Sequence, residues 1–375
     1  MMSNQKTRGR MGRRDFIEGS VMAAGAATLL AGAQQVAAQA PPAPGAAPAG
    51  APPPGGGPPP GGGGRPPGDR VLGTALPAGQ RQQPQLTSLK GKTIYITGGN
   101  TGIGLGIGRA AANAGMNVVM GYIQDNQVEP ALKLYKADQK DRVIAIRHDV
   151  TDRDGWVTTL KQINDKFGNL HLLVNNAGIK TLRQASQVDA KSWDAAVAVN
   201  FTGIYNGCAA VVPHMIAHKE GAHIVTTSSM GGMLPGVNAG VYTCTKFASC
   251  GLMEALRVEL AGTNIGTSVF MPGGVSTDNI LSDAGNVPAN SMDPLEAGER
   301  VLNGVVNNDL FIFSHPEFKP GIKERLDAIL ASEPTDGFPE VRARGELRVL
   351  TSPAYAPEVT HRSKPRKNYR STTPG

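Results

Sequence analysis

The sequence predicts an α/β fold in which helices cover both faces of a doubly wound parallel sheet. From about Leu86 onward, short β-like runs alternate with helical stretches, the pattern of right-handed strand–helix–strand crossovers. The β-like runs are continuous in Val, Ile and Leu, which is typical of parallel strands buried on both faces. A glycine-rich loop separates the first of these runs from the first helical stretch. Together, these observations predict a single Rossmann-like domain.

The individual elements follow from the same pattern along the chain. The first helix is expected from Leu105 to Ala114, in a run rich in small residues. Helical stretches separate the later strands, and the sequence has no internal repeat. The predicted strands are Thr93–Thr97, Asn117–Gly121, Val143–Arg147, His171–Val174, Ala222–Thr226, Gly266–Phe270 and Phe311–Phe313.

Residues 1–40 are predicted to be an export signal. A basic beginning precedes a mildly apolar stretch, Val21 to Ala33, which is too short and too rich in Ala and Gly for a stable membrane span. Arg13–Ile17, Arg-Arg-Asp-Phe-Ile, resembles the twin-arginine pattern, although Glu18 stands where that pattern often has Lys. Cleavage is expected near Ala38–Ala40 or Val36–Ala38. The mature protein would then lie in the periplasm; the alternative is a cytoplasmic protein with a disordered basic N-terminus.

Two extensions are predicted to flank the folded domain, which we place at residues 86–333. Residues 41–85 form a linker that is almost entirely Pro, Gly and Ala up to residue 69, so it has nothing large and apolar to bury. We expect it to be a semi-extended spacer. Residues 334–375 lose the alternating pattern and are rich in Arg and Lys, which predicts a solvated, loosely ordered basic extension.

The composition argues against several classes of site. The formal net charge is +7, part of it in the N-terminal segment, and no nucleic-acid recognition motif accompanies it, so no nucleic-acid partner is expected. Cys208, Cys244 and Cys250 have neither metal-ligand spacing nor a paired framework. The seven His residues form no ligand motif, and no metal site is predicted.

Residues 97–104, Thr-Gly-Gly-Asn-Thr-Gly-Ile-Gly, are predicted to bind the diphosphate of a dinucleotide. Gly98 can form the tight turn, Gly102 lets the backbone approach a pyrophosphate, and Gly104 lets the helix pack close to the strand. The first N–H groups of the helix have no intrahelical partner, and its positive end attracts phosphate. For this motif alone, a glycine-rich turn in some other α/β domain is the alternative.

Further motifs follow in a fixed order, and together they resemble the short-chain dehydrogenase/reductase family. The glycines after Thr97 have that family's Gly-x-x-x-Gly-x-Gly spacing. Any one motif is weak, but the order of all of them is specific, and the resemblance covers roughly residues 88–330. The other matching motifs are Asn175–Gly178 (Asn-Asn-Ala-Gly), Asn200, Ser229 at the end of the run Ile224–Ser229, Tyr242–Lys246 (Tyr-x-x-x-Lys) and Pro272–Thr277.

A tyrosine and a lysine on one helix predict a general acid/base. Tyr242 and Lys246 are four residues apart, so both side chains lie on one helical face. Free tyrosine has a pKa of about 10, and a neighbouring ammonium group favours the phenolate, as would the positive nicotinamide of an oxidised coenzyme. Tyr242 would protonate a developing alkoxide in reduction, or accept the alcohol proton in oxidation.

The resemblance implies roles for two more catalytic residues and for the lysine. Ser229 lies thirteen residues before Tyr242, the family's spacing, which favours it over Ser228. Its hydroxyl would hydrogen-bond and orient the substrate oxygen. Asn200 would anchor a water in a proton relay that reaches Lys246, and Lys246 would also hold the nicotinamide ribose. Taken singly, each of these residues also fits an ordinary structural role.

The resemblance also implies the residues that contact the coenzyme. Asp149 matches the residue that bonds the adenine amine, although a helix N-cap before Thr151 is an alternative. Asn176–Gly178 would line the adenosine side, and Thr277 would reach the carboxamide. The full predicted set is Gly98, Asn100, Thr101, Gly102, Ile103, Gly104, Tyr122, Asp149, Val150, Asn176, Ala177, Gly178, Tyr242, Lys246, Pro272, Gly273, Val275 and Thr277.

The coenzyme is expected to be NADP or NAD, with a slight preference for NADP. A carboxylate at the end of the second strand would select NAD by binding the adenosine 2′-hydroxyl. That position falls at Tyr122, and the first carboxylate after it is Asp125. The usual arginine for a 2′-phosphate is missing too, because Ile123 and Gln124 follow.

The sequence therefore predicts an NAD(P)-dependent oxidoreductase that interconverts a small-molecule alcohol and carbonyl by hydride transfer. A non-catalytic NAD(P)-binding scaffold or sensor is the alternative, and the presence of all four catalytic residue types argues against it. The resemblance implies a homodimer or homotetramer. A substrate-specificity loop is expected between Asp278 and Asp293, and its mixture of apolar and small polar residues does not identify the substrate.

Overall fold

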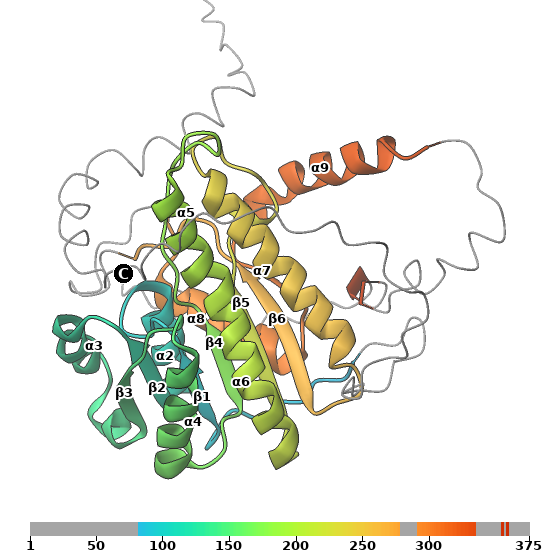
Figure 1. Cartoon of the computed structure of the whole chain (residues 1–375). Coiled ribbons are helices and arrows are strands. Elements are labelled where there is room, and N and C mark those ends of the chain that lie inside the picture. Colours follow the sequence, from blue (N-terminus) through green and yellow to red (C-terminus); the bar gives the residue numbers. More distant parts are fainter. Residues whose placement is uncertain (1–81, 278–290, 335–353, 356–357, 360–375) are drawn as a thin grey trace, which may run out of the picture. The chain divides into compact units, whose positions relative to one another are not determined.

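One parallel sheet organises the part of the chain that the structure describes, which is residues 82–277, 291–334, 354–355 and 358–359 of a computed structural model (Figure 1). Its seven strands lie in the order β3-β2-β1-β4-β5-β6-β7, so the predicted doubly wound α/β fold is confirmed. The strands are β1 Thr93–Ile96, β2 Asn117–Tyr122, β3 Val143–Arg147, β4 Leu172–Asn175, β5 Ala222–Thr227, β6 Ile265–Met271 and β7 Phe311–Phe313.

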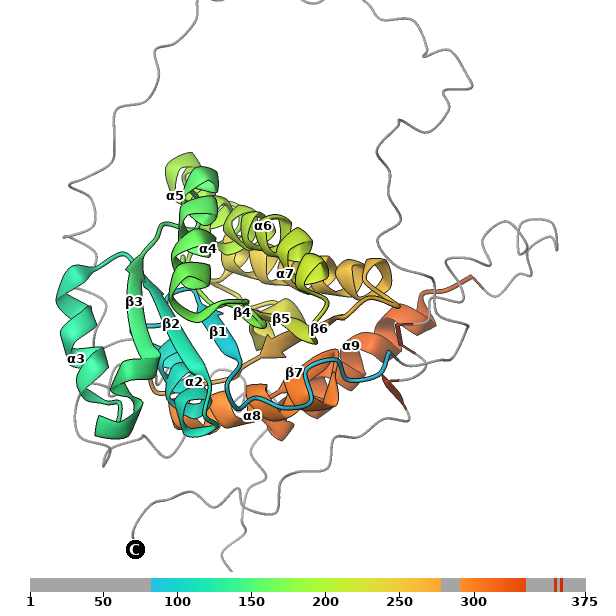
Figure 2. The ribbon, with the colours of Figure 1, turned by 90° about the horizontal axis from the view of Figure 1, so that it is seen from below.

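Helices cover both faces of this sheet (Figure 2). Helices α2 and α8 pack on one face, whereas α4, α6 and α7 pack on the other, as the continuous apolar strands require. The helices are α2 Gly102–Asn113, α3 Val128–Lys133, α4 Arg153–Phe167, α5 Ala190–Val197, α6 Gly203–His218, α7 Gly240–Glu259, α8 Pro294–Asn307 and α9 Lys319–Ala331. The first of these begins three residues before the predicted start at Leu105.

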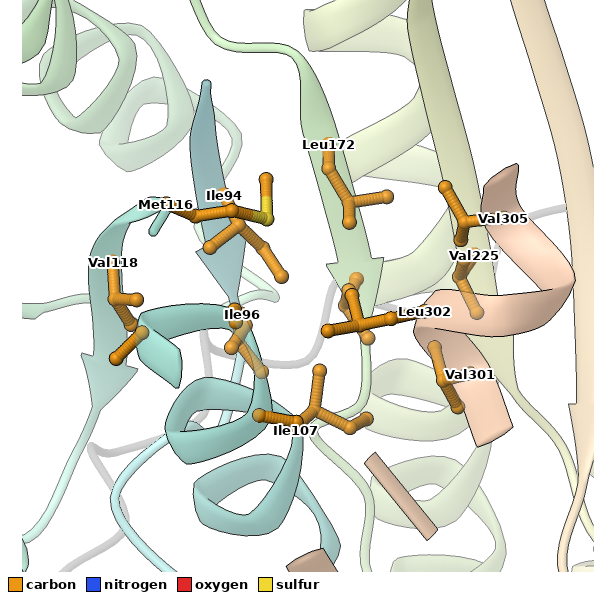
Figure 3. Packing of buried hydrophobic residues seen from close by; sticks show 14 of the residues in the cluster. Ile94, Ile96, Ile107, Met116, Val118, Leu172, Val225, Val301, Leu302 and Val305 are labelled. Carbon is orange, nitrogen blue, oxygen red and sulfur yellow. The ribbon is translucent and has the colours of Figure 1, made fainter. Parts of the chain in front are cut away.

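The α2–α8 layer forms one half of the core. Ile94 and Ile96 of β1 lie fully buried against Ile107 of α2 and Val301 of α8 (Figure 3). The two helices cross closely, because a Cβ at Gly106 would fall on the carbonyl oxygen of Pro294. This contact holds α2 close to α8 on the same face of the sheet.

A continuous helical run, Ala190–His218, joins α5 to α6 through a π-helical turn. Among the described residues it is the segment that is long and apolar enough to cross a bilayer, but half of that window is buried inside the domain. Burial against the sheet accounts for this apolar character, since a core helix of a soluble protein has the same composition.

Both flanking segments contact the end of α7. The buried side chain of Gln82 donates to the main-chain oxygen of Leu260, the C-cap of α7, at 3.3 Å, and to that of Ile265 in β6 at 2.9 Å. Glu358, in the basic extension, pairs with the buried Arg257 of α7 at 3.0 Å. The guanidinium also bonds the side chain and main chain of Asn308, just after α8. The expected linker and tail therefore each supply a residue that packs on the domain.

Candidate active site

The loop after β1 has a conformation that needs glycine at several positions. Gly98 and Gly102 have φ values of +61° and +51°, a region that glycine adopts without strain. A Cβ at Gly104 would overlap the carbonyl oxygen of Gly98 and lie 2.6 Å from Nδ2 of Asn176. Extended Thr101 precedes α2 and makes no side-chain cap hydrogen bond. The first-turn N–H groups of α2 thus face the loop without a capping side chain, which suits a bound phosphate.

The hydroxyl of Thr97 ties this loop to the segment after β4. Its oxygen accepts the main-chain N–H groups of Asn176 and Ala177, both at 2.9 Å. In return, the Asn176 amide donates to the main-chain oxygens of Thr97 and Gly98, at 3.1 and 3.2 Å. The sequence prediction included Thr97 in the glycine loop but gave it no role. Thr97 directly follows β1, which pairs with β4, and this position is the feature that could have indicated its contact with the segment after β4.

The expected adenosine end lies at the ends of β2 and β3. Asp149 is exposed, and its carboxylate accepts the N–H and the hydroxyl of Thr151. Helix α4 begins at Arg153 with Asp152 as its N-cap, so the alternative that Asp149 caps this helix is wrong. The carbonyl of Val150 accepts the indole N–H of Trp156. Asp149 therefore remains accessible for a base, while Val150 anchors the turn beneath it.

Sequence reasoning missed Arg147. It ends β3 in register with Tyr122 of β2, and its side chain lies 4.0 Å from Asp125. An arginine thus stands beside the position that discriminates the two coenzymes, although none follows Tyr122 directly in the sequence. Only the pairing of β2 with β3 reveals it. Asn100, predicted as a coenzyme contact, is buried and donates its side-chain amide to Gln127 at 3.0 Å.

Tyr242 and Ser229 come together at the carboxyl edge of the sheet. Ser229 follows β5 and caps the short helical turn Met230–Gly232, accepting the N–H of Gly231 at 3.1 Å. Burial raises the pKa of Tyr242 above its ordinary value, and a hydrogen bond with Ser229 opposes that rise. The phenol is therefore protonated at neutral pH and stands ready to donate its proton.

Lys246 lies one turn further along α7 and is buried. Its ammonium donates to the main-chain oxygen of Thr227 at 2.8 Å and lies 5.5 Å from the centroid of the Tyr242 ring. Burial lowers the pKa of Lys246 to about 8. Burial has the largest effect on the pKa of Tyr242, and it acts in the direction opposite to the effect expected of this lysine.

The two serines after β5 have different environments. Ser228 is fully buried, and its hydroxyl donates to the main-chain oxygen of Lys246 at 2.9 Å. It also accepts the thiol of Cys250. Ser229, by contrast, lies next to the Tyr242 ring across Gly231, whose Cβ would be 3.2 Å from that ring. This arrangement is the one expected if Ser229 contacts the substrate and Ser228 holds α7 in place.

Asn200 sits in the π-helical turn Ala198–Thr202 between α5 and α6. Its side-chain oxygen accepts the N–H of Ile179 at 2.8 Å, and its amide donates to the carbonyl of Ile179 at 2.9 Å. The amide also reaches the hydroxyl of Thr245, next to Lys246 on α7. The side chain thus braces the segment after Gly178 against α7, and a Cβ at Gly178 would lie 3.2 Å from Oδ1 of Asn200 and 3.9 Å from Nζ of Lys246.

The turn after β6 closes the other side of the site. The carbonyl of Pro272 accepts the N–H of Met230 at 2.9 Å, which joins this turn to Ser229. At its far end, Thr277 covers the glycine loop, since a Cβ at Gly102 would lie 3.1 Å from the Thr277 methyl group. Val275 bridges to Met292, and residues 278–290 of the expected specificity loop lie outside the described residues.

These segments all leave the carboxyl ends of β1, β4, β5 and β6, where parallel α/β sheets bind ligands. The glycine loop, the uncapped first turn of α2 and the open carboxylate of Asp149 fit a dinucleotide, and Lys246 and Tyr242 stand at the opposite end of the same edge. Within the described part of the chain, no group of three His, Cys, Asp or Glu residues is placed to hold a metal ion.

Comparisons with known proteins agree with this geometry. The family model for short chain dehydrogenases matches residues 92–284. A C alpha-dehydrogenase from Sphingobium sp. (strain NBRC 103272 / SYK-6) is 29% identical, over 66% of this chain and 89% of its own. The structure of a short-chain dehydrogenase from Novosphingobium aromaticivorans is 31% identical with a TM-score of 0.65, covering 72% of this chain and 98% of that one. The structure of LigO from Sphingobium sp. strain SYK-6 is 32% identical with a TM-score of 0.59, and the match covers 70% of this chain and 96% of LigO.

Replacing Gly104 with Ala is expected to weaken both folding and coenzyme binding. The added Cβ would push the loop away from Asn176, and overpacking of this kind lowers the free energy of unfolding by about 1–3 kcal/mol. Thermal unfolding and a fluorescence titration with NADPH and NADH measure the two effects. Gly251→Ala on α7 is the control, because a Cβ there meets no atom within 4 Å. A Gly104→Ala protein with wild-type stability and affinity would contradict the packing argument.

Proposed function

Because the chain belongs to the short-chain dehydrogenase/reductase family, we propose that it is an NAD(P)-dependent oxidoreductase that interconverts an alcohol and a carbonyl on a small molecule. One observation supports this most directly. Tyr242 lies beside Ser229, whose side chain opposes the rise that burial causes in the pKa of the phenol, and one helical turn from buried Lys246, at the edge of the sheet that carries the glycine loop. The three groups are those that proton transfer to and from a substrate oxygen requires.

The roles of the side chains follow from their surroundings. When bound, the nicotinamide coenzyme supplies or accepts the hydride. Ser229 hydrogen-bonds the substrate oxygen and so fixes its distance from Tyr242. Tyr242 is protonated at neutral pH, and burial favours this form further by raising its pKa, so it can donate its proton to that oxygen in reduction. In oxidation Tyr242 accepts the alcohol proton, a step that needs positive charge nearby to favour the phenolate.

Lys246 supplies part of that charge and holds its own position. One of its three N–H groups is used by the Thr227 carbonyl, which leaves two for the ribose hydroxyls and the relay from Asn200. With a pKa of about 8 the amine is mostly protonated at pH 7. A non-catalytic scaffold or sensor would have no need of a protonated phenol beside Ser229, so the catalytic function is favoured over that alternative.

We propose NADP as the preferred coenzyme. The end of β2 carries Tyr122 rather than a carboxylate, and Arg147 of β3 lies beside it in register. An arginine near this point accommodates a 2′-phosphate in dinucleotide-binding folds. The partial pairing of Arg147 with the exposed Asp125 leaves the guanidinium free to reorient, since both side chains are largely exposed.

We also propose that the mature protein is exported and forms a homo-oligomer. The twin-arginine pattern at Arg13–Ile17 supports export in the folded state, so the coenzyme could travel bound to the enzyme. Exposed apolar side chains on the outer helices, among them Trp193 of α5 and Val258 of α7, support the oligomer.

Replacing Tyr242 with Phe is expected to lower kcat by about a thousandfold or more while coenzyme affinity changes little. The variant keeps the ring and removes the proton that general acid catalysis uses, a contribution of about 10²–10⁴ in rate. Turnover is measured over steroid, sugar and short-chain alcohol and carbonyl panels with both coenzymes. Tyr205→Phe, at an exposed tyrosine of α6, is the matched control. Unchanged turnover in Tyr242→Phe would defeat the catalytic assignment and favour the scaffold.

Replacing Arg147 with Ala is expected to raise KM for NADPH about tenfold and to leave KM for NADH nearly unchanged. The lost charge-assisted hydrogen bond to phosphate corresponds to about 1.5 kcal/mol. Steady-state kinetics with each coenzyme gives both values. Arg300→Ala, which removes an arginine paired with Glu296 on α8, controls for the loss of charge. Equal effects on the two coenzymes would argue against a 2′-phosphate contact.

Exchange of both Arg13 and Arg14 for Lys is expected to abolish export while leaving the enzyme active. A twin-arginine signal is read by a receptor, so conserving the charge does not replace the pair. Immunoblots of periplasmic and cytoplasmic fractions measure the distribution, and the exchange of Arg8 and Arg10 for Lys is the control. A cytoplasmic wild-type protein would support the alternative of an unexported chain.

A further inference from the structure

The turn after β6 and the residues after β7 leave the sheet side by side. The two strands pair in parallel with Met271 in register with Phe313, so Pro272 and Gly273 emerge next to Ser314 and His315. The main-chain N–H of Gly273 donates to Oγ of Ser314 at 3.0 Å, and it also approaches Nδ1 of His315 at 3.3 Å. The register of the last strand pair therefore brings a side-chain acceptor to the turn.

Ser314 and His315 form a pair with a defined hydrogen-bond direction. Oγ of Ser314 lies 2.6 Å from Nδ1 of His315. Because Nδ1 also faces the N–H of Gly273, this ring nitrogen acts as an acceptor, and the ring proton resides on Nε2. Ser314 then donates its hydroxyl proton to Nδ1 and keeps its lone pairs for Gly273. Ser314 is fully buried, so water does not compete for these contacts.

The packing around Gly273 allows little freedom. A Cβ there would lie 2.8 Å from the His315 ring and 2.8 Å from the Phe318 ring. The two rings meet edge to face, with centroids 6.2 Å apart. The imidazole of His315 thus lies directly on the backbone of the turn, where a side chain would otherwise be.

The same turn controls the position of Ser229. The carbonyl of Pro272 accepts the N–H of Met230, and the carbonyl of Phe270 accepts the N–H of Ser228 at 2.8 Å. Both neighbours of Ser229 are therefore bonded to the end of β6 and its turn. A displacement of the turn would move the Ser229 hydroxyl relative to Tyr242.

We propose that Ser314 and His315 are positioning residues of the active site, which act by holding the Pro272–Gly273 turn. They touch neither substrate nor coenzyme; Ser314 fixes the N–H of Gly273, and His315 orients the Ser314 hydroxyl and supports the backbone. The proposal rests on the proposed function, because it matters for catalysis only if the turn borders the nicotinamide end and Ser229 binds the substrate oxygen.

Amide hydrogen exchange of the protein without coenzyme tests the structural half. In Ser314→Ala the N–H of Gly273 loses its nearer acceptor and keeps only the longer contact with Nδ1 of His315, so its exchange is expected to become about tenfold faster than in the wild type. Ser314→Cys is expected to behave like Ser314→Ala, because sulfur keeps the volume and accepts weakly. Ser332→Ala removes an exposed serine hydroxyl at the end of α9 and is the control. The proposal would be overturned if the Gly273 N–H exchanged at the wild-type rate in Ser314→Ala. It would also be overturned if this N–H exchanged at the wild-type rate in Ser314→Cys but not in Ser314→Ala.

Steady-state kinetics tests the functional half. Ser314→Ala is expected to lower kcat and to raise the KM for coenzyme, each about tenfold, with little change in melting temperature. His315→Ala is expected to do the same, whereas His315→Asn, whose amide oxygen can accept in place of Nδ1, is expected to recover most of the loss. Faster Gly273 exchange with unchanged kinetics, or equal losses in both His315 variants, would overturn the positioning role.

The two sets of results separate this proposal from the proposed function. If the wild-type protein neither binds nor turns over NAD(P), the proposed function fails, and the exchange measurement still decides whether Ser314 holds the turn. If the wild type is active and Ser314→Ala is equally active, the positioning role fails while the proposed function stands.

Discussion

The active site depends on the close approach of the glycine loop to the chain that follows β4. The Thr97 hydroxyl and the Asn176 amide exchange hydrogen bonds across this contact, and Gly104 leaves room for it by having no side chain. The contact lies between β1 and β4, where the strand order reverses and a parallel sheet opens a crevice. Once it is made, the order of the sheet brings the segments after β5 and β6 to the same edge.

Burial has the largest influence on the electrostatics of the catalytic helix. The sequence suggests a phenol whose pKa is lowered by a neighbouring ammonium group, but in the structure burial raises the pKa of Tyr242 and lowers that of Lys246. Both shifts favour the uncharged forms, because each group has left water. At rest, Tyr242 is therefore a protonated phenol, and Lys246 beside it is an ammonium group that loses its proton more readily than an exposed lysine does. A protonated Tyr242 is the state from which carbonyl reduction begins.

Local patterns in the sequence were enough to predict the fold and to identify the motifs in their order along the chain. Continuous apolar runs identified the seven strands to within one residue at each end, because a strand buried on both faces is largely apolar. The missed residues have a common cause. Arg147 lies beside Tyr122, and Ser314 beside Gly273, through the register of neighbouring strands, which no local pattern encodes. The partners of Asn200 likewise come from distant parts of the chain, because Ile179 follows β4 and Thr245 lies on α7.

The buried Arg257 extends the folding unit beyond the segment that carries the chemistry. Its guanidinium is satisfied by Asn308 after α8, by Gln82 before β1 and by Glu358 in the basic extension. A buried charge that loses its partner is strongly destabilising, so each of these acceptors contributes to folding although none is near Tyr242. The family match at residues 92–284 contains the arginine and none of these three acceptors. The stability of α7, and with it the alignment of Tyr242 and Lys246, therefore depends on residues from both sides of the matched segment.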